Sequence, residues 1–328
     1  MPRTAPVGRL EVRVLVDNSA DMLSTPGPSA ESELAGLVRR GMRLISGRCL
    51  CCAAHGFACT VTAQRGAERR TVLFDSGPDP LVLLGNAVKL GIDWGDIDAI
   101  MLSHGHFDHT GAVLAALDAI RNRKGRGGTP VYLHPKMFWR RGQTLPDGTV
   151  VVLDDVPPPD LLREAGAEPV VTADPANLFD GLFHVSGEIP RVTPFEMGLP
   201  GHVRRSDDGK RWEPDPLLMD ERFLAVDVAD KGLIIFSACS HAGIVNVLHQ
   251  ARANFPDTPL HGVIGGFHLA GPNEAIIPQT IEALKPFALP VIAAGHCTGW
   301  RAQAALAEAF GQAVLAPTAA GKSYTFSS

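Results

Sequence analysis

The spacing of apolar residues along the first half of the chain predicts alternating strands and helices. LEVRVLVDN at 10–18 alternates apolar and polar side chains and is rich in β-branched residues, which predicts a strand. FACTVTAQRGAERRTVLFDSG at 57–77 predicts a hairpin that turns near Gly66, and the apolar spacing of 80–92 predicts a helix that ends at Gly91. Shorter runs follow: strands DAIMLS and PVYLH on either side of a helix over 111–124, and a short helix around 31–41.

The second half repeats this alternation more regularly. RFLAVDVADKGLIIFSACS at 222–240 predicts two strands around a turn at 230–232. The remaining predicted elements are a helix at 242–253, strand HGVIGGFH, a helix near 274–285, strand PVIAAGHCTG and a helix at 300–310. Strands alternating with helices are the signature of an α/β fold.

Between about 140 and 220 the pattern is poor, and proline, glycine and charged residues are frequent. We expect long loops with little regular structure there, which makes this insertion a candidate lid or substrate-facing segment. The length of 328 residues suits one large α/β domain or two smaller ones. We expect a single domain over 1–328 with an irregular insertion.

Composition narrows the class of protein. The chain is 45% hydrophobic and 20% charged with a net charge of −5, which gives no reason to expect nucleic acid or an anionic membrane as partner. The first thirty residues show no secretion signal, and no apolar run is long enough to span a bilayer. We therefore expect a soluble, cytoplasmic protein, with oligomeric state open.

The six cysteines favour reduced thiols over a scaffold of disulfides. CLCCAAHGFAC at 49–59 clusters four of them beside His55, but it offers no second C-x-x-C pair for a zinc ribbon. Without a secretion signal a disulfide framework is not expected. Thiols in and beside a core strand are the favoured interpretation, with a structural metal or a redox role as the alternative.

Histidines follow several of the predicted strands directly. They are His104, His241, His268 and His296. In α/β proteins, ligand sites gather where the carboxyl ends of strands open into loops. One such histidine would suggest only a structural hydrogen bond, but four with the same placement predict a shared site.

The segment SHGHFDHTGA at 103–112 adds metal-binding side chains at close spacing. Residues two apart on an extended or turning chain return to one side, so His104 and His106 can face one cation. Asp108 and His109, further along the turn, can face a second. Imidazole with carboxylate suits zinc, iron or manganese, and calcium prefers oxygen ligands. Gly105 and Gly111 allow so tight a turn.

HGHFDH matches the H-x-H-x-D-H signature of the metallo-β-lactamase-fold hydrolases, and LFDSG at 73–77 resembles the first motif of that superfamily. More narrowly, the chain resembles a subgroup commonly named for 7,8-dihydropterin-6-yl-methyl-4-(β-D-ribofuranosyl)aminobenzene 5'-phosphate synthase. The segments that carry this resemblance are AAHGFACTV, NAVKLGIDWGDIDAIMLSHGHFDHTGA, SGEIPR, CSHAGIVN, IGGFHLAGP and GHCTG.

The resemblance implies a four-layer αβ/βα sandwich, α/β or α+β by different schemes, with a two-metal site between the sheets. His104 and His106 would hold the first metal. The second would be held by Asp108, His109 and a histidine from a later strand end, for which His296 is our choice. The expected cofactors are two divalent ions, zinc first, with manganese or iron as alternatives.

Two departures from the family pattern leave the first metal's ligands open. The superfamily usually has a bridging aspartate after a strand such as GLIIFSAC, where this chain has Cys239. Cys239 could ligate as a thiolate or be a small buried residue. The usual histidine about twenty residues earlier is missing, so Asp220 could substitute or His241 could reach in.

The implied chemistry is attack of a metal-activated water on an ester, lactone or phosphoester of a small molecule. Asp108 and His268 are the candidate catalytic side chains, with His268 as general acid. Arg191 and His268 are candidate substrate contacts; arginine suits a phosphate. Asp75 would sit behind a ligand histidine and orient it.

Two other functions stay open. The same scaffold can hold a di-iron redox centre, although no flavodoxin-like stretch is present. Alternatively, Cys239 and the missing histidine could mark a metal-binding sensor with weak catalysis. Fold alone does not decide between these reactions.

Overall fold

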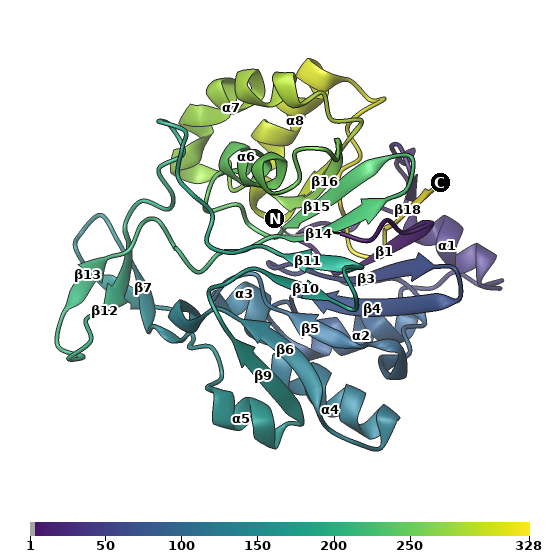
Figure 1. Cartoon of the computed structure of the whole chain (residues 1–328), viewed down its shortest axis with the longest axis horizontal. Coiled ribbons are helices and arrows are strands. Elements are labelled where there is room, and N and C mark those ends of the chain that lie inside the picture. The colour runs from purple at the N-terminus through teal and green to yellow at the C-terminus, as the bar shows by residue number, and fades with distance from the viewer. Residues whose placement is uncertain (1–3) are drawn as a thin grey trace.

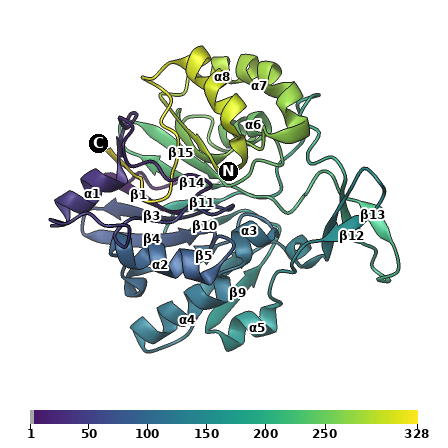
Figure 2. The same cartoon turned by 180° about the vertical axis from the view of Figure 1, so that it is seen from behind.

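The computed structural model describes residues 4–328 and shows two large sheets stacked face to face between two outer layers of helices (Figure 1; Figure 2). The fold class expected from the sequence is confirmed. Helices of the first half cover one sheet and helices of the last third cover the other. Each sheet has two apolar faces, and this arrangement buries one against the other sheet and the other against helices.

The first sheet has eight strands in the order β2-β18-β1-β3-β4-β5-β6-β9. The pairs β18–β1, β1–β3 and β3–β4 are antiparallel, whereas β4, β5, β6 and β9 run parallel to one another, as short βα units require. Its strands are β1 (Arg9–Val16), β2 (Ala30–Glu31), β3 (Ala58–Arg65), β4 (Glu68–Phe74), β5 (Ala99–Met101), β6 (Thr129–Leu133), β9 (Ala167–Val171) and β18 (Ser323–Ser327).

The second sheet has six strands in the order β10-β11-β14-β15-β16-β17. Its last three strands are parallel and buried on both faces, which explains their nearly continuous apolar sequences. The strands are β10 (Ala176–Leu178), β11 (Phe183–Val185), β14 (Leu224–Val228), β15 (Gly232–Ser237), β16 (Leu260–Gly266) and β17 (Val291–Gly295).

Helices seal the outer faces, and a core lies between the sheets. Phe74 of β4 meets Phe236 of β15 across this central layer, with ring centroids 6.1 Å apart. On the first sheet lie α2 (Pro80–Leu90) and α4 (Val113–Lys124), and on the second lie α6 (Ile244–Asn254), α7 (Ile277–Leu284) and α8 (Trp300–Phe310). Shorter helices are α1 (Glu33–Arg39), α3 (Phe107–Thr110) and α5 (Pro159–Glu164).

The insertion at 140–220 is more regular than expected. It contains α5, contributes β9 to the first sheet and β10 and β11 to the second, and forms a small separate sheet of order β13-β12-β7-β8 at one side of the sandwich (Figure 1). The strands of the small sheet are β7 (Arg141–Thr144), β8 (Val150–Val152), β12 (His202–Arg205) and β13 (Trp212–Pro214). The expectation of little regular structure was wrong because strands of three to five residues are too short to show a period.

Most other predicted elements are confirmed. The hairpin is β3 and β4, and α2 ends at Gly91, whose φ of 66° is the left-handed conformation typical of a helix C-cap. The strand β18 was not predicted. Among residues 4–328, no helix is long and apolar enough to cross a membrane. The expected cytoplasmic location stays a prediction.

Candidate metal centre

The histidines that follow the strands do meet at one edge of the two sheets. His104 follows β5, His241 follows β15, His268 follows β16 and His296 follows β17. The backbone at this edge is strained, with positive φ at four residues other than glycine. These are Asp75, Ser240, His268 and His296, with φ between 44° and 58°. Strained backbone conformations are frequent at functional sites, where a side chain must be held in a direction that the relaxed backbone would not give it.

His104, His106 and His241 form the first of two groups of candidate ligands. One nitrogen of each ring lies within 4.8 Å of the others, and all three side chains are buried. Burial lowers the pKa of each ring well below its usual value, and neighbouring histidines lower it further. The three rings are therefore neutral, as metal-binding imidazoles must be.

Hydrogen bonds fix the proton positions in this first group. The Ser103 hydroxyl donates to Asp75 Oδ2 at 2.7 Å, so its oxygen accepts from His104 Nδ1 at 2.9 Å. The Nε2 of His104 then carries a lone pair, which accepts from His106 Nδ1 at 3.1 Å. The Nε2 of His106 is left with a lone pair of its own.

That lone pair faces His202, which the small sheet brings in from β12. His202 Nδ1 donates to the backbone oxygen of Asp215 at 2.8 Å, so its Nε2 is also unprotonated. Burial lowers the pKa of His202 to about 4, which keeps the ring neutral. The two Nε2 atoms of His106 and His202 lie 3.1 Å apart. Two facing lone pairs repel each other, and a cation close to both would remove the repulsion.

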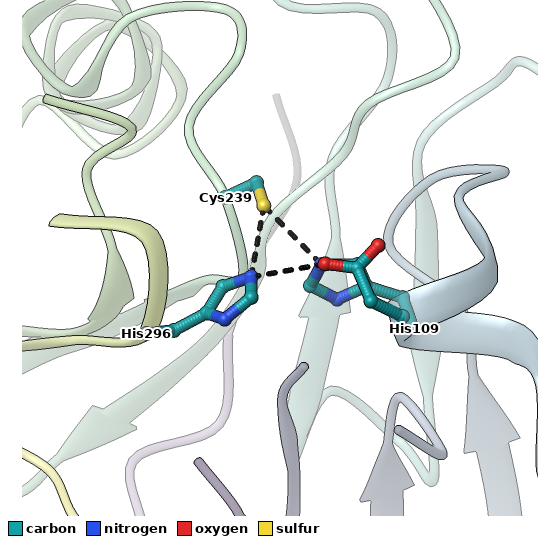
Figure 3. A group of neighbouring side chains, drawn as sticks. His109, Cys239 and His296 are labelled. Carbon is teal, nitrogen blue, oxygen red and sulfur yellow. Dashed lines mark hydrogen bonds and ion pairs between the residues drawn. The ribbon is translucent and has the colours of Figure 1, made fainter. Parts of the chain in front are cut away.

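Asp108, His109, Cys239 and His296 form the second group, and their ligand atoms also lie within 4.8 Å of one another. Cys239 Sγ is 3.2 Å from the Nε2 atoms of both His109 and His296, and Figure 3 shows these side chains pointing toward one another. Asp108 Oδ2 is 3.4 Å from His296 Nε2. The rings of His104 and His109 are 4.3 Å apart between centroids, so the two groups are adjacent.

The second group attracts positive charge. Burial alone would raise the pKa of Asp108, but the charges of His109 and His296 hold it well below its usual value. Burial alone would lower the pKa of His296, but Cys297 and Asp108 raise it to about 9. Protons on these rings balance the carboxylates in the metal-free protein, and a divalent ion would replace them.

Acceptors behind the second group orient its histidines. His109 Nδ1 donates to Asp75 Oδ2 at 2.7 Å, and His296 Nδ1 donates to Asn18 Oδ1 at 2.8 Å. Asp75 also accepts from the backbone N–H of Ser103 at 2.7 Å. A ring held this way directs its Nε2 at a ligand. Asp75 lies directly behind His109, and its role in orienting a metal ligand stays a prediction.

His268 lies beside the two groups, at the mouth of the site. Its ring centroid is 4.3 Å from that of His241, and with Cys239 and Cys297 it forms a third set of neighbouring ligand-type atoms. A small pocket opens next to it. The pocket is lined by Glu196, Met197, Gly198, Ser240, His241, Gly243, Phe267, His268, Leu269, Asn273 and Ile276.

Two other predicted residues are engaged elsewhere. Asp220, one alternative for the first group, accepts from Arg141 at 2.6 and 2.8 Å and from the Gly105 N–H at 2.8 Å. It thus braces the histidine turn, whereas the other alternative, His241, joins the first group. A Cβ at Gly105 would lie 2.6 Å from the Met137 carbonyl oxygen, so close packing requires this glycine.

The guanidinium of Arg191 donates to the carbonyl oxygens of Ile189, Leu217 and Leu218 and ties two loops together. It does not line the pocket beside His268. Its contact with substrate stays a prediction.

Sequence reasoning missed three residues at this centre. Asn18 ends the first predicted strand, and His55 lies 3.4 Å from Asp108 Oδ2 with 64% of its side chain exposed. His202 lies in the insertion that was expected to be irregular. The position of His55 in AAHGFACTV was a usable signal, because that segment carried the family resemblance. Asn18 and His202 are recognised only from their contacts with His296 and His106, which are distant in the sequence.

The donor set fits divalent metal ions. Imidazoles, one carboxylate and one thiol converge, and the rings whose outer nitrogens are held by acceptors present the inner ones to the site. Both nitrogens of His241 are buried and lack a hydrogen-bond partner among the residues that the structure describes. Such an orphaned polar ring needs an unseen partner.

Fold and site together define a class of metal-dependent enzyme. A family model, the metallo-beta-lactamase superfamily, matches residues 56–204. The 7,8-dihydropterin-6-methyl-4-(beta-D-ribofuranosyl)-aminobenzene-5'-phosphate synthase of Methanocaldococcus jannaschii is 31% identical over 258 residues, which cover 78% of this chain and 85% of the relative. The chain belongs to the metallo-beta-lactamase superfamily and is an enzyme of that superfamily, as the motif resemblance implied.

Two further proteins are similar to this chain, one in sequence and one in fold. An uncharacterized protein of Methanocaldococcus jannaschii is 27% identical over 261 residues, covering 78% of this chain and 88% of its own. Among solved structures, Tm1679, a metal-dependent hydrolase of the beta-lactamase superfamily, superposes with a TM-score of 0.69 at 22% identity. That match covers 97% of this chain and 100% of Tm1679, and it supports the fold.

Proposed function

We propose that this protein is a hydrolase, or a related transferase, that uses two divalent metal ions on a small molecule bearing a phosphate, ester or lactone. His104, His106, His241 and His202 would hold one ion, and Asp108, His109, Cys239 and His296 the other. The facing lone pairs of His106 and His202, 3.1 Å apart in a buried site, carry this proposal. A metal ion close to both nitrogens would make them compatible, and burial lowers the pKa of both rings, which disfavours a proton in that place.

The donor atoms favour zinc. A thiol beside imidazoles is a ligand set typical of zinc, whereas manganese and magnesium prefer oxygen ligands. This also favours hydrolysis over the di-iron redox alternative, because carboxylates are few here: Asp108 is the one carboxylate in the two groups of described residues.

Metal ions bound in these groups would polarise a phosphoryl or carbonyl oxygen and activate water for attack. The chain itself supplies the surroundings. The described ligand residues are at most 6% exposed, so bulk water is largely excluded and electrostatic interactions with substrate are strong. His241 and His268 face the pocket, so the scissile group would enter past them.

We propose that His268 is the general acid that donates a proton to the leaving group. Its Nδ1 is buried without a hydrogen-bond partner among the described residues, and the ring lies against His241 at the pocket. A proton donor must be within hydrogen-bond reach of the leaving atom, which the pocket position allows. The phosphate in the name of the Methanocaldococcus jannaschii relative supports a phosphate-bearing substrate for this chain too.

The proposal is tested first by metal content and turnover together. Protein purified without added metal is analysed by elemental mass spectrometry and assayed on a panel of phosphomonoesters, phosphodiesters and lactones. We expect two zinc ions per chain and turnover of at least one class. Two irons with oxygen-dependent chemistry, or full zinc without any turnover, would overturn the proposed reaction in favour of the redox or the sensor alternative.

A second test separates His268 from the ligands. His268→Ala is expected to keep its zinc but to lose turnover by about 10²–10⁴-fold, most for substrates with poor leaving groups. A matched control is Asn273→Ala, which lines the same pocket and donates to the His268 carbonyl oxygen at 3.0 Å. Loss of zinc from His268→Ala would make His268 a ligand instead.

A further inference from the structure

Two thiols meet beside the second group of ligands. Cys239 follows β15 and Cys297 follows β17, and the Cys297 thiol lies 3.4 Å from the Cys239 sulfur. The same thiol lies 3.4 Å from the Cys239 carbonyl oxygen. All six cysteines are free in this structure. Because a disulfide has sulfurs about 2.0 Å apart, the pair needs to close by only about 1.4 Å.

The strand between them makes this approach possible. β16 separates β15 from β17 in the sheet, and its last residue is Gly266. A Cβ on Gly266 would lie 2.6 Å from Cys297 Sγ and 2.5 Å from the Ala238 carbonyl oxygen. Only glycine leaves room for the two sulfurs to meet over this strand.

We propose that Cys239 and Cys297 form a reversible disulfide when a peroxide reaches the site, and that the bond withdraws Cys239 from the second group of ligands. The loss of metal rests on the proposed function, in which Cys239 is a ligand. The cross-link itself rests on the geometry alone. The pair is thus a modification site, and its oxidation state sets whether the second group is complete.

The covalent step balances with hydrogen peroxide as the oxidant. The residue Cys297 is 8% exposed against 2% for Cys239, and its neighbour His268 lines the pocket. Its sulfur takes one oxygen from peroxide to give a sulfenic acid, and water leaves. Cys239 sulfur then displaces that oxygen as a second water, and the S–S bond forms. Two thiols lose two electrons and two protons, and one peroxide becomes two waters.

The consequence for metal binding follows from the ligand chemistry. A thiolate is a strong zinc ligand, whereas a disulfide sulfur carries no charge. With Cys239 engaged, the second group keeps Asp108, His109 and His296. Loss of a residue that only hydrogen-bonds a metal ligand lowers metal affinity by about 10–100-fold. We therefore expect loss of the ligand Cys239 to lower the zinc affinity of the second group by at least about tenfold. A dithiol reductant restores both thiols by exchange.

The experiment uses the full chain carrying Cys49→Ser and Cys52→Ser, which removes the two cysteines outside the site that are not buried. Zinc-loaded protein is treated with limited hydrogen peroxide, then digested and mapped by mass spectrometry, and its zinc is measured by elemental analysis. We expect a loss of two hydrogen atoms per chain, a Cys239–Cys297 cross-linked peptide and release of one of two zinc ions. Dithiothreitol with added zinc should reverse all three.

The matched control is the same protein with Cys297→Ser, each sample compared with its own untreated portion. It should give no cross-link and should release less zinc at the same peroxide dose. Peroxide that oxidises Cys239 or Cys297 without joining them would overturn the disulfide. A cross-link with zinc fully retained would overturn its effect on the metal. If the untreated protein holds no zinc, the proposed function fails, while the cross-link still decides the thiol pair.

Discussion

The two groups of candidate ligands are adjacent but differ in the chemistry that holds them together. The first group consists of neutral imidazoles, and one facing imidazole, that of His202, arrives on a separate small sheet. The second group combines a carboxylate, a thiol and two imidazoles from the edge of the main sandwich. An ion in the first group would gain no charge neutralisation from its ligands, whereas an ion in the second would.

This difference predicts that the two groups would bind their ions with different affinities. Charge and a rigid sheet edge favour tight binding in the second group. The first group depends on how well the insertion docks against the sandwich, because β12 lies outside both large sheets.

Removing the metal should have the largest effect. Excess chelator is expected to abolish turnover and, if zinc was present at about a thousand times its Kd, to lower the free energy of unfolding by about 4 kcal/mol. Release should be biphasic, with the ion of the first group leaving first. Elemental analysis during chelator titration and denaturant unfolding measure the two effects. Release of both ions in a single step would break the contrast.

Single ligand substitutions come next. His109→Ala should remove the ion of the second group, and His106→Ala the ion of the first, each with the fold retained because neither side chain belongs to the three apolar cores. Loss of a residue that only hydrogen-bonds a metal ligand lowers activity by about 10–100-fold. We expect a larger loss of activity in each of these two variants, because a ligand itself is removed. Zinc per chain and circular dichroism are the readouts. A His106→Ala protein with full zinc content would make the ligand assignment wrong.

A substitution on the small sheet sharpens the contrast. His202→Ala should weaken the first ion by about 10–100-fold and leave the second unchanged, because His202 lies against His106 of the first group. Competition titration with a coloured zinc chelator gives both affinities. Arg211→Ala, an exposed change in the connection between β12 and β13, is the matched control and should alter neither. Equal weakening of both ions would contradict the separate role of the insertion.

The smallest effect is expected behind the second group. Asn18→Ala removes the acceptor of His296 Nδ1, and we expect the second ion to bind about tenfold more weakly while the first is unaffected. The same titration measures it. An unchanged affinity would show that the strained backbone at His296, with φ of 47°, orients the ring without help from Asn18.

The sequence predicted the parts of this molecule whose signal is local. Period and turn chemistry identified α2 with its C-cap at Gly91, the hairpin of β3 and β4, and α8 with its observed bounds. His241, His268 and His296 follow neighbouring parallel strands of the second sheet, so they share one edge of it, whereas His104 follows β5 of the first sheet and joins them because the two sheets are stacked. That reasoning brought His241 and His296 to the turn at His104 before any contact was known.

What it missed depends on contacts between distant segments. His202 reaches His106 across 96 positions, and Asn18 reaches His296 across 278. Nothing in the flanking residues distinguishes these two from ordinary polar positions. The short strands of the insertion gain their order from pairing, as β12 does with β7 and β13, and not from a period of their own. The hydrophobic pattern of a single short segment does not reveal which distant strand it pairs with.

The position of β18 in the first sheet has a consequence for how the chain is made. This last strand lies between β1 and β2 and pairs with β1 along Arg9–Arg13. During synthesis the outer edge of β1 (Arg9–Val16) therefore waits until Ser323–Ser327, far along the chain, have left the ribosome. An unpaired edge strand is a template for association with other chains. We expect nascent or C-terminally truncated chains to depend on chaperones far more than the completed enzyme does.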